Sequence, residues 1–143
     1  MSVAVDTNVI LDIVTDDPPH AEESLSRLRL ALADGEVVVG EIVWAELTPT
    51  LAEYGGVGPT LSALQISYRV SNEETLGLAG SAFFSYLRNQ RPQTCRKCGA
   101  TIAGRARILP DFMIGAHALV HAGRLLTRDR GYYAKYFPDL VLV

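Results

Sequence analysis

Short apolar runs alternate with stretches of helical hydrophobic spacing along this chain. Runs of three to five mostly apolar residues predict buried strands. The predicted strands are Val3–Val5, Val37–Val39, Ile66–Val70, Arg124–Thr127 and Leu140–Val143. Between them, apolar residues recur three or four positions apart, as on the buried face of a helix. The predicted helices are Asn8–Val14, a segment opened by Pro18 and Pro19 and stopped by Gly35, Glu41–Tyr54, Asn72–Asn89 and Pro110–Ala122.

Local signals set the ends of these helices. Pro49 lies inside the third helix and predicts a kink or an early end, and Gly55-Gly56 predicts a break after it. Ser71-Asn72-Glu73-Glu74 fits a Ser-x-x-Glu capping box at the start of the fourth helix. Residues 91–109 form the least regular segment.

Strands that alternate with helices predict an α/β fold with a mainly parallel sheet. A length of 143 residues suits one compact domain, residues 1–143, and 48% hydrophobic residues allow a sizeable core. In such sheets ligands collect beyond the carboxyl ends of the strands. We therefore expect the functional residues at that edge.

The net charge of −3 conceals an asymmetry between the two halves of the chain. Residues 1–74 contain 13 acids and three bases, whereas residues 75–143 contain three acids and ten bases. A basic segment can bind phosphate or an acidic partner, and it can equally fold against the acidic half. The charge pattern alone leaves both interpretations open.

Two aspartates lie just after the ends of predicted strands. Asp6 ends the first apolar strand and starts the first helix, so it can cap that helix or point into the crevice beyond the sheet. We interpret it as functional, because the cap needs only one of the adjacent Asp, Thr and Asn residues. Asp129 follows Leu125-Leu126-Thr127 in the same way, although a single aspartate in a turn is more often structural.

Two further acids lie on predicted helices. Asp111 follows Pro110 in a first turn, where a carboxylate interacts favourably with the helix dipole. Glu46 is four residues after Ile42 and three after Val43, which places it at the edge of an apolar stripe. A carboxylate near a core implies a cationic partner, and Arg or Lys could supply it.

Asp6, Glu46, Asp111 and Asp129 can all reach one crevice. Four carboxylates this close would repel one another by about 1–4 kcal/mol per pair unless cations lie between them. Ligand sets made only of oxygen suit Mg²⁺ or Mn²⁺. Such a site activates a water and stabilises charge on a phosphoryl group, so the quartet predicts metal-assisted phosphodiester hydrolysis.

The four segments around these acids resemble, in order, the motifs of PIN-domain ribonucleases. The segments are Val5-Asp6-Thr7-Asn8-Val9-Ile10-Leu11-Asp12, Trp44-Ala45-Glu46-Leu47, Pro110-Asp111-Phe112-Met113-Ile114-Gly115-Ala116-His117-Ala118 and Thr127-Arg128-Asp129-Arg130-Gly131-Tyr132-Tyr133. The resemblance covers nearly the whole chain and points to the toxin component of VapBC-type toxin–antitoxin pairs.

This resemblance implies an α/β/α sandwich with a short, mainly parallel sheet and an Mg²⁺- or Mn²⁺-dependent endoribonuclease. It implies that Asp6, Glu46, Asp111 and Asp129 are the catalytic metal ligands and that Asn8 and Thr127 support them. It also implies an RNA substrate, a metal-activated water, a homodimer and a cognate antitoxin protein that covers the active site.

The segment at about 91–109 departs from the family motifs. Cys95 and Cys98 form one CxxCG, which resembles half of a zinc-ribbon site. A structural Zn²⁺ normally needs four ligands, so a second chain or a histidine would have to complete it. A reversible disulfide and two inert thiols are the alternatives. Four basic residues of this segment suit RNA or an acidic part of an antitoxin, namely Arg96, Lys97, Arg105 and Arg107.

His117 and His121 lie four residues apart on the helix that starts at Pro110, a spacing that can chelate a metal. At about 100° per residue they point about 80–120° away from Asp111. We therefore predict packing or surface roles for both histidines.

We expect a soluble, cytoplasmic protein. No secretory signal precedes Asp6, and the longest uncharged stretches are too short to cross a bilayer. Two other functions remain possible from the sequence. One is a non-catalytic RNA- or protein-binding module on the same fold. The other is a phosphatase with Asp6 as nucleophile, although those enzymes usually have a second aspartate where this chain has Asn8.

Overall fold

A five-stranded parallel sheet forms the centre of the protein, with strand order β3-β2-β1-β6-β7. The structure is a computed structural model that describes residues 1–89, 93–102 and 108–143. The strands are β1 (Ser2–Val5), β2 (Glu36–Val39), β3 (Ile66–Tyr68), β6 (Arg124–Leu126) and β7 (Val141–Leu142). All four pairings are parallel. The predicted α/β class with a mainly parallel sheet is confirmed.

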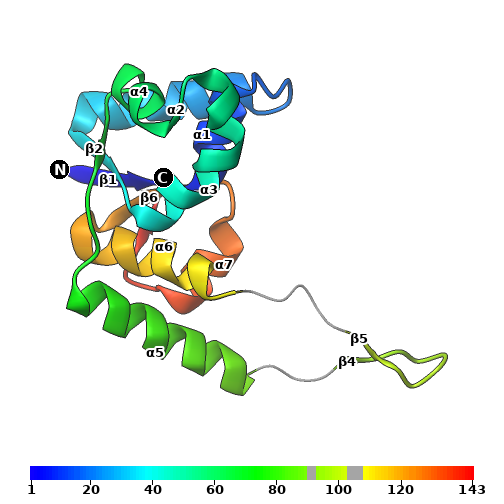
Figure 1. The fold of residues 1–143 in the computed structure, drawn as a ribbon. Helices are drawn as coiled ribbons and strands as arrows, with labels where there is room; N and C mark the ends of the chain where they lie inside the picture. Colours follow the sequence, from blue (N-terminus) through cyan, green and yellow to red (C-terminus); the bar gives the residue numbers. More distant parts are fainter. Residues whose placement is uncertain (90–92, 103–107) are drawn as a thin grey trace.

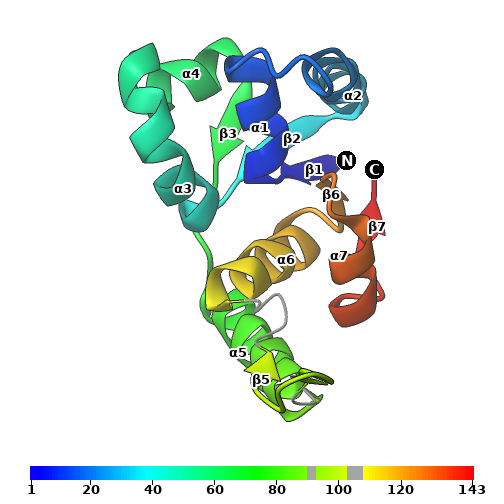
Figure 2. The same ribbon diagram turned by 90° about the vertical axis from the view of Figure 1, so that its right-hand side faces the viewer.

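Helices cover both faces of this sheet (Figure 1). Those on one face are α1 (Thr7–Val14), α2 (Ala21–Asp34), α3 (Glu41–Leu51) and α4 (Val57–Ala63), with a 3-10 turn η1 (Ala52–Tyr54). Those on the other face are α5 (Glu73–Asn89), α6 (Leu109–His121) and α7 (Arg130–Tyr136). Figure 2 shows the same two helical layers from the side, so the fold is an α/β/α sandwich.

The sheet is buried between the layers because its strands are short and almost entirely apolar. Val3, Val5 and Val37 have essentially no exposed surface, as expected for a parallel sheet covered on both faces. On one side, the ring of Phe112 at the start of α6 lies 5.3 Å from the ring of Phe83 in α5, measured between centroids. It lies 5.3 Å from the ring of Tyr132 in α7 as well. This aromatic contact fixes the beginning of α6, where Asp111 lies.

Several element boundaries differ from the sequence predictions. The second helix begins at Ala21 rather than at Pro18, because Pro18 and Pro19 lie in the turn before it. The third helix continues through Pro49 and changes to a 3-10 turn after Leu51. The helices α4 and α7 were not predicted at all.

The predicted capping box of α5 is wrong in its capping residue. The Asn72 side chain accepts hydrogen bonds from the backbone N–H of Thr75 at 2.9 Å and from the Thr75 hydroxyl at 2.9 Å. Ser71 instead donates to Glu41 from its backbone N–H and from its hydroxyl. The cap is therefore one residue later than predicted, and Ser71 joins α5 to the start of α3.

The irregular segment contains a small antiparallel hairpin, β4 (Gln93–Thr94) and β5 (Thr101–Ile102). Figure 1 shows this hairpin standing apart from the helical layers. Among the described residues, no helix is both long and apolar enough to cross a membrane.

Candidate functional site

Asp6 lies where the central strand β1 ends and α1 begins. Its backbone N–H donates to the carbonyl of Leu126 at 3.0 Å, which extends the pairing of β1 with β6 by one residue. Its side chain then turns toward α1, and Oδ1 accepts the backbone N–H of Thr7 at 2.8 Å. Asp6 therefore does cap α1, but this bond uses only one of its two carboxylate oxygens.

The second carboxylate oxygen of Asp6 is surrounded by side-chain donors. Oδ2 accepts from Asn8 Nδ2 at 2.8 Å, from the Thr127 hydroxyl at 2.6 Å and, at 3.5 Å, from the Tyr133 hydroxyl. Asp6 is 6% exposed and Thr127 is fully buried. The two residues predicted to support the acids, Asn8 and Thr127, thus contact Asp6 directly.

Burial and a neighbouring negative charge both act on the Asp6 carboxyl. Burial raises its pKa, and the negative charge of Glu46 raises it further. Hydrogen bonds from Thr127, from the Thr7 backbone and from Asn8 lower it, but the net pKa remains above the ordinary value of 3.8. Ionised Asp6 is therefore a costly negative charge, and nearby positive charge would stabilise it.

The pKa of the Tyr133 phenol responds to the charges of several of the acids. Burial raises the pKa of its phenol, and the negative charges of Asp6, Asp111 and Asp129 raise it further. The phenol therefore stays neutral and can act as a hydrogen-bond donor to Asp6. Three of the four predicted acids influence this one buried hydroxyl.

Glu46 is joined to Asp6 through the residue between them in space, Thr7. The Thr7 hydroxyl donates to Glu46 Oε2, while the Thr7 backbone N–H donates to Asp6. The Glu46 residue is exposed, which corrects the expectation of a half-buried carboxylate. Its neighbours Val43 and Leu47 are buried, but the Glu46 side chain reaches along the helix surface to the start of α1.

Asp129 is positioned by the same hydrogen-bond network. Its backbone N–H donates to the Thr127 hydroxyl at 3.0 Å, and that hydroxyl donates in turn to Asp6. The neighbouring residue, Arg128, donates its backbone N–H to Asn8 Oδ1 at 3.4 Å. The turn after β6 is thus connected to the turn after β1, and Asp129 precedes the first residue of α7.

Asp111 has a structural role in the first turn of α6, where the sequence placed it. Its Oδ2 accepts the backbone N–H of Ile108 at 3.0 Å, three residues earlier, so it closes the first turn of α6. The bond occupies one oxygen of a half-buried carboxylate. Asp111 can therefore stabilise the helix start and still present its other oxygen.

An ion pair that was not predicted supports the turn after β6. The Arg128 guanidinium binds both oxygens of Asp12, each at 2.9 Å, through Nε and a terminal nitrogen. Asp12 is 3% exposed and also accepts the Ser24 hydroxyl at 2.7 Å. This two-point pair attaches the segment between Thr127 and Asp129 to α1 and α2.

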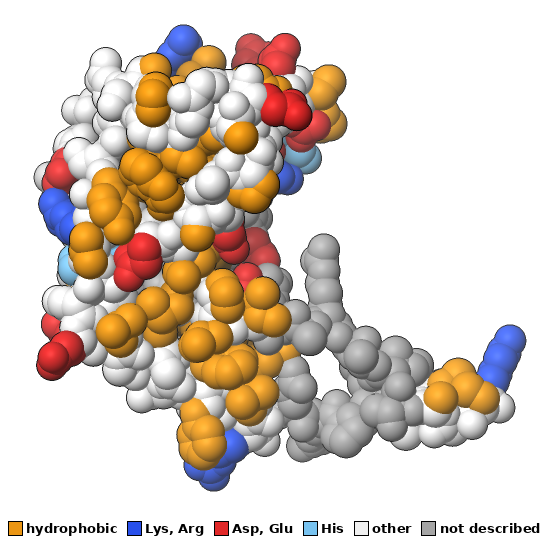
Figure 3. Space-filling view, viewed as in Figure 1, with side chains coloured by type: hydrophobic (Ala, Val, Ile, Leu, Met, Phe, Trp, Pro, Cys, Tyr) orange, Lys and Arg blue, Asp and Glu red, His pale blue; other side chains and the backbone are white. Residues whose placement is uncertain are grey.

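The described contacts link Glu46 to Asp6 and bring Asp6, Asp111 and Asp129 near Tyr133, but they do not form a closed ligand set. Figure 3 shows acidic side chains within the hollow between the two helical layers, on the side toward the hairpin. Among the described residues, no group of three or more His, Cys, Asp or Glu side chains is close enough to hold a metal ion. No ion pair between described residues involves Asp6, Glu46 or Asp111.

Two residues of this network were missed as functional candidates, Thr7 and Tyr133. Both lie inside the quoted motifs, Thr7 directly after Asp6 and Tyr133 four residues after Asp129. Their positions within the motifs were the available signal. Their contacts join residues 39 and 127 positions apart, and local spacing cannot show such pairings.

The remaining predicted residues lie in or near the hairpin. Cys95 and Cys98 are free thiols in the turn between β4 and β5. Arg96 and Lys97 between them are exposed. Arg105 and Arg107 lie outside the described residues.

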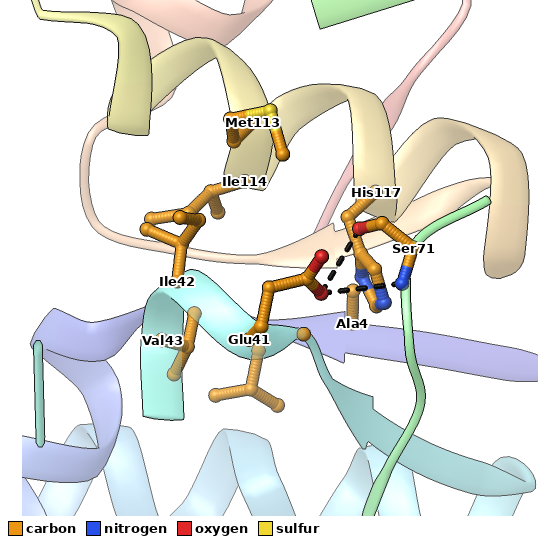
Figure 4. A pocket seen from close by; sticks show the side chains of 10 residues that line it. Ala4, Glu41, Ile42, Val43, Ser71, Met113, Ile114 and His117 are labelled. Atoms are coloured by element: carbon orange, nitrogen blue, oxygen red, sulfur yellow. Dashed lines mark hydrogen bonds between the residues drawn. The ribbon is translucent and has the colours of Figure 1, made fainter. Parts of the chain in front are cut away.

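The two histidines bind backbone and hydroxyl groups between β3 and α5, as their predicted packing role requires. Buried His117 donates from Nε2 to the carbonyl of Arg69 at 2.8 Å. Burial lowers its pKa, so the ring is neutral at pH 7. The His121 ring lies 3.1 Å from the Thr75 hydroxyl, measured from Nε2 to Oγ1. Figure 4 shows His117 beside Glu41 in a space of about 10 Å³, room for about one water molecule.

Comparisons with known proteins agree with this architecture. The family model of the PIN domain matches residues 3–138. The fold is similar to a chain of the VapBC2 complex from Rickettsia felis bound to a promoter DNA fragment, with TM-score 0.66 and 18% identity over 100% of this chain and 98% of that one. A chain of VapBC-1 from nontypeable Haemophilus influenzae gives TM-score 0.64 and 19% identity over 100% and 97% of the two chains.

A chain of FitAcB from Neisseria gonorrhoeae gives TM-score 0.61 and 19% identity, over 98% of this chain and 95% of that one. No curated protein sequence matches the chain. Since these structures are less than 25% identical to the chain, their similarity establishes the fold.

Proposed function

Because this chain belongs to the PIN domain family, we propose that it is a divalent-metal-dependent endoribonuclease and the toxin of a type II toxin–antitoxin pair. The observation that carries the proposal is Asp6, a buried carboxylate that accepts four hydrogen bonds at the end of the central strand. No Lys or Arg among the described residues pairs with it. Its raised pKa favours a cation at this point.

The donor chemistry of the site fits Mg²⁺ or Mn²⁺. Asp6, Glu46, Asp111 and Asp129 would hold the cation through oxygen atoms, the ligands these hard ions prefer. Mg²⁺ is commonly bound by one or two carboxylates with water completing its shell, so the Asp6–Glu46 pair is a sufficient starting set. When bound, the cation supplies positive charge for the phosphate and lowers the pKa of a water molecule.

The surrounding residues orient the acids and favour the ionised form of Asp6. Thr127 and Asn8 donate to Asp6 and favour its charged form. Thr7 holds Glu46, and the Thr127 hydroxyl holds the backbone of Asp129. Such supporting contacts typically change metal affinity or activity 10- to 100-fold when removed. The RNA backbone would bring its phosphates to this acidic hollow, and the basic residues of the hairpin would offset the repulsion.

The direct test is cleavage of RNA by the purified chain with Mn²⁺ or Mg²⁺ and with excess EDTA. We expect cleavage that requires the metal, and a loss of at least about 100-fold in Asp6→Asn and Glu46→Gln. A ladder of internal cuts, rather than stepwise shortening from one end, identifies an endonuclease.

Arg29→Ala, on the exposed face of α2, is the matched control and should cut like the wild type. If the wild type binds RNA but cuts it no faster than Asp6→Asn, the alternative of a non-catalytic RNA-binding module replaces this proposal.

The toxin role predicts a cognate antitoxin protein and a homodimer in the cytoplasm. Induced expression of the wild type should arrest growth, whereas Asp6→Asn should not. Co-expression of a small protein from an adjacent reading frame should restore growth and bind the purified chain. Growth arrest by both the wild type and Asp6→Asn would argue against toxicity through this site.

A further inference from the structure

The turn of the β4–β5 hairpin places two thiols together on a compact scaffold. Cys95 and Cys98 are separated by two residues, and the backbone closes around them, with Cys95 N–H donating to Ala100 O at 2.8 Å. Gly99 N–H donates back to Cys95 O at 2.9 Å. Gly99 has φ +71°, a left-handed conformation that glycine adopts without strain. The glycine after the second cysteine thus lets the chain turn back into β5.

Backbone donors point at the first sulfur. The N–H groups of Lys97 and Cys98 bind the Cys95 sulfur, and the Cys98 side chain adds a third contact. Hydrogen bonds of this kind stabilise a thiolate, the form of cysteine that binds metals.

Cysteine spacing of this type supplies two of the four ligands of a structural zinc site. The other two cannot come from neighbouring positions, because residues 75–110 contain no His, Asp or Glu and no further Cys. His117 is engaged by the carbonyl of Arg69 after β3, and His121 by Thr75 in α5. The remaining histidine, His20, lies at the start of α2, far from the hairpin in Figure 1.

We propose that the hairpins of two copies of this chain bind one Zn²⁺ between them through Cys95 and Cys98 of each copy. The hairpin stands clear of the helical layers, so a second hairpin can approach it (Figure 1). Four thiolates around one Zn²⁺ leave a net charge of −2. The exposed Arg96 and Lys97 lie between the cysteines and place four positive charges beside the site in the pair. The metal would therefore join two copies at a point remote from Asp6 in sequence and on a separate element.

The test is metal analysis and native mass spectrometry of the full chain, purified without chelators and then washed with EDTA. We expect about one Zn²⁺ per two chains, carried by the dimer. Titration with Co²⁺ should give the intense visible spectrum of tetrahedral thiolate coordination and should reach its end at half an equivalent per chain. Cys95→Ser and Cys98→Ser should each lose the metal and the spectrum.

Two control variants separate this site from its alternatives. Thr94→Ser changes the residue beside Cys95 without removing a thiol and should keep the zinc. Asp6→Asn should also keep it, which excludes zinc held by the acidic hollow. One zinc per chain, zinc retained in Cys95→Ser, or an intramolecular disulfide in freshly purified protein would each overturn the proposal.

Discussion

Asp6 combines burial, negative charge and several hydrogen-bond donors, and these act on stability in opposite directions. The donors favour the charged form, but burial and the nearby Glu46 outweigh them and raise the pKa. An acid whose pKa is higher in the folded state than in the unfolded chain destabilises the fold as pH rises through that interval. The ionised Asp6 carboxylate therefore lowers the stability of the folded state at neutral pH, and the same negative charge can bind a cation.

Asp6→Asn should consequently stabilise the metal-free protein at pH 7. We expect a higher Tm for the variant than for the wild type, because the variant no longer carries a buried negative charge. The gain should shrink as pH falls through the raised pKa of Asp6, and it should be lost below 3.8, the ordinary value for Asp, where Asp6 is protonated in both states. Thermal unfolding in EDTA from pH 3.5 to pH 8 measures this. Saturating Mn²⁺ should raise the Tm of the wild type and leave that of the variant unchanged. Equal Tm values at every pH would contradict the role given to burial.

Thr127 tests how far the Asp6 network controls activity. Thr127→Val keeps the shape of a fully buried side chain but removes the hydroxyl that lowers the pKa of Asp6. We expect cleavage to fall about 10- to 100-fold and its acidic limb to move to higher pH, since ionised Asp6 is the active form. Thr127→Ser keeps the hydroxyl and should keep the profile. Rates measured across pH distinguish this from simple loss of fold, which would lower the whole profile without moving its limb.

At the residue level the sequence predicted a set of candidate acids but not the contacts between them. Asp6 was interpretable because an acid that ends a buried apolar strand is unusual, and Asn8 follows it closely. The expected burial of Glu46 was wrong because helical spacing shows which face a residue occupies but not where a long side chain extends. The contact of Tyr133 with Asp6 joins residues 127 positions apart, so the local pattern did not predict it.

At the scale of elements, the site depends on the turn after β6 being attached to α1. The Arg128–Asp12 pair makes that attachment through two hydrogen bonds and buries Asp12 almost completely. Removing Arg128 would leave a buried carboxylate whose one other side-chain partner among the described residues is the Ser24 hydroxyl. A buried charge without its counter-ion is far more damaging than the loss of an exposed pair.

Arg128→Ala should therefore lower the free energy of unfolding by about 1–3 kcal/mol, somewhat below the loss expected for a fully buried pair because the arginine is 41% exposed. Asp12→Asn in the same chain should recover part of that loss. Arg124→Ala removes the exposed pair with Asp34, the last residue of α2, and should cost less than about 1 kcal/mol. Urea unfolding of the wild type and the three variants measures these differences. Equal losses for Arg128→Ala and Arg124→Ala would contradict the proposed role of the Asp12 pair.

The same scale shows where sequence patterns fail for whole elements. The helix α4 has seven residues and contains Gly58 and Pro59, so it carries no recognisable helical spacing. It exists because Val57 and Leu61 are buried against neighbouring elements. The predicted cap at Ser71 was displaced because Glu41, 30 residues earlier, accepts both of its donors. Tertiary contacts decided each of these cases.

For the whole molecule, the alternation of strands and helices was enough to predict the parallel α/β sandwich, because each apolar strand must be covered on both faces. The hairpin was not predictable in this way, since its strands have two residues each and no buried face was apparent from the sequence. The structure also shows where some residues of the charge asymmetry lie. Asp6 and Glu46 of the first half are linked through Thr7 where β1 ends, while Arg96 and Lys97 lie in the turn of the hairpin.

This arrangement predicts how RNA binding depends on salt. The acidic hollow repels phosphate, so the affinity of the chain for RNA must come from basic residues outside it. Arg96 and Lys97 are exposed and can supply such contacts.

Binding should be measured in the inactive Asp6→Asn background, so that the RNA remains intact, over a range of KCl concentrations. Changing Arg96 and Lys97 to Ala should weaken binding and reduce the slope of log K against log salt by about 1–2, because two phosphate contacts are lost. Arg29→Ala removes an exposed charge on α2 and should leave the slope unchanged.

Both cysteines remain in the double variant, so its zinc content should match that of the parent. A loss of zinc would mean that the weaker RNA binding comes from a disrupted hairpin instead. An unchanged slope with intact hairpins would mean that the basic half serves the fold or the antitoxin rather than RNA.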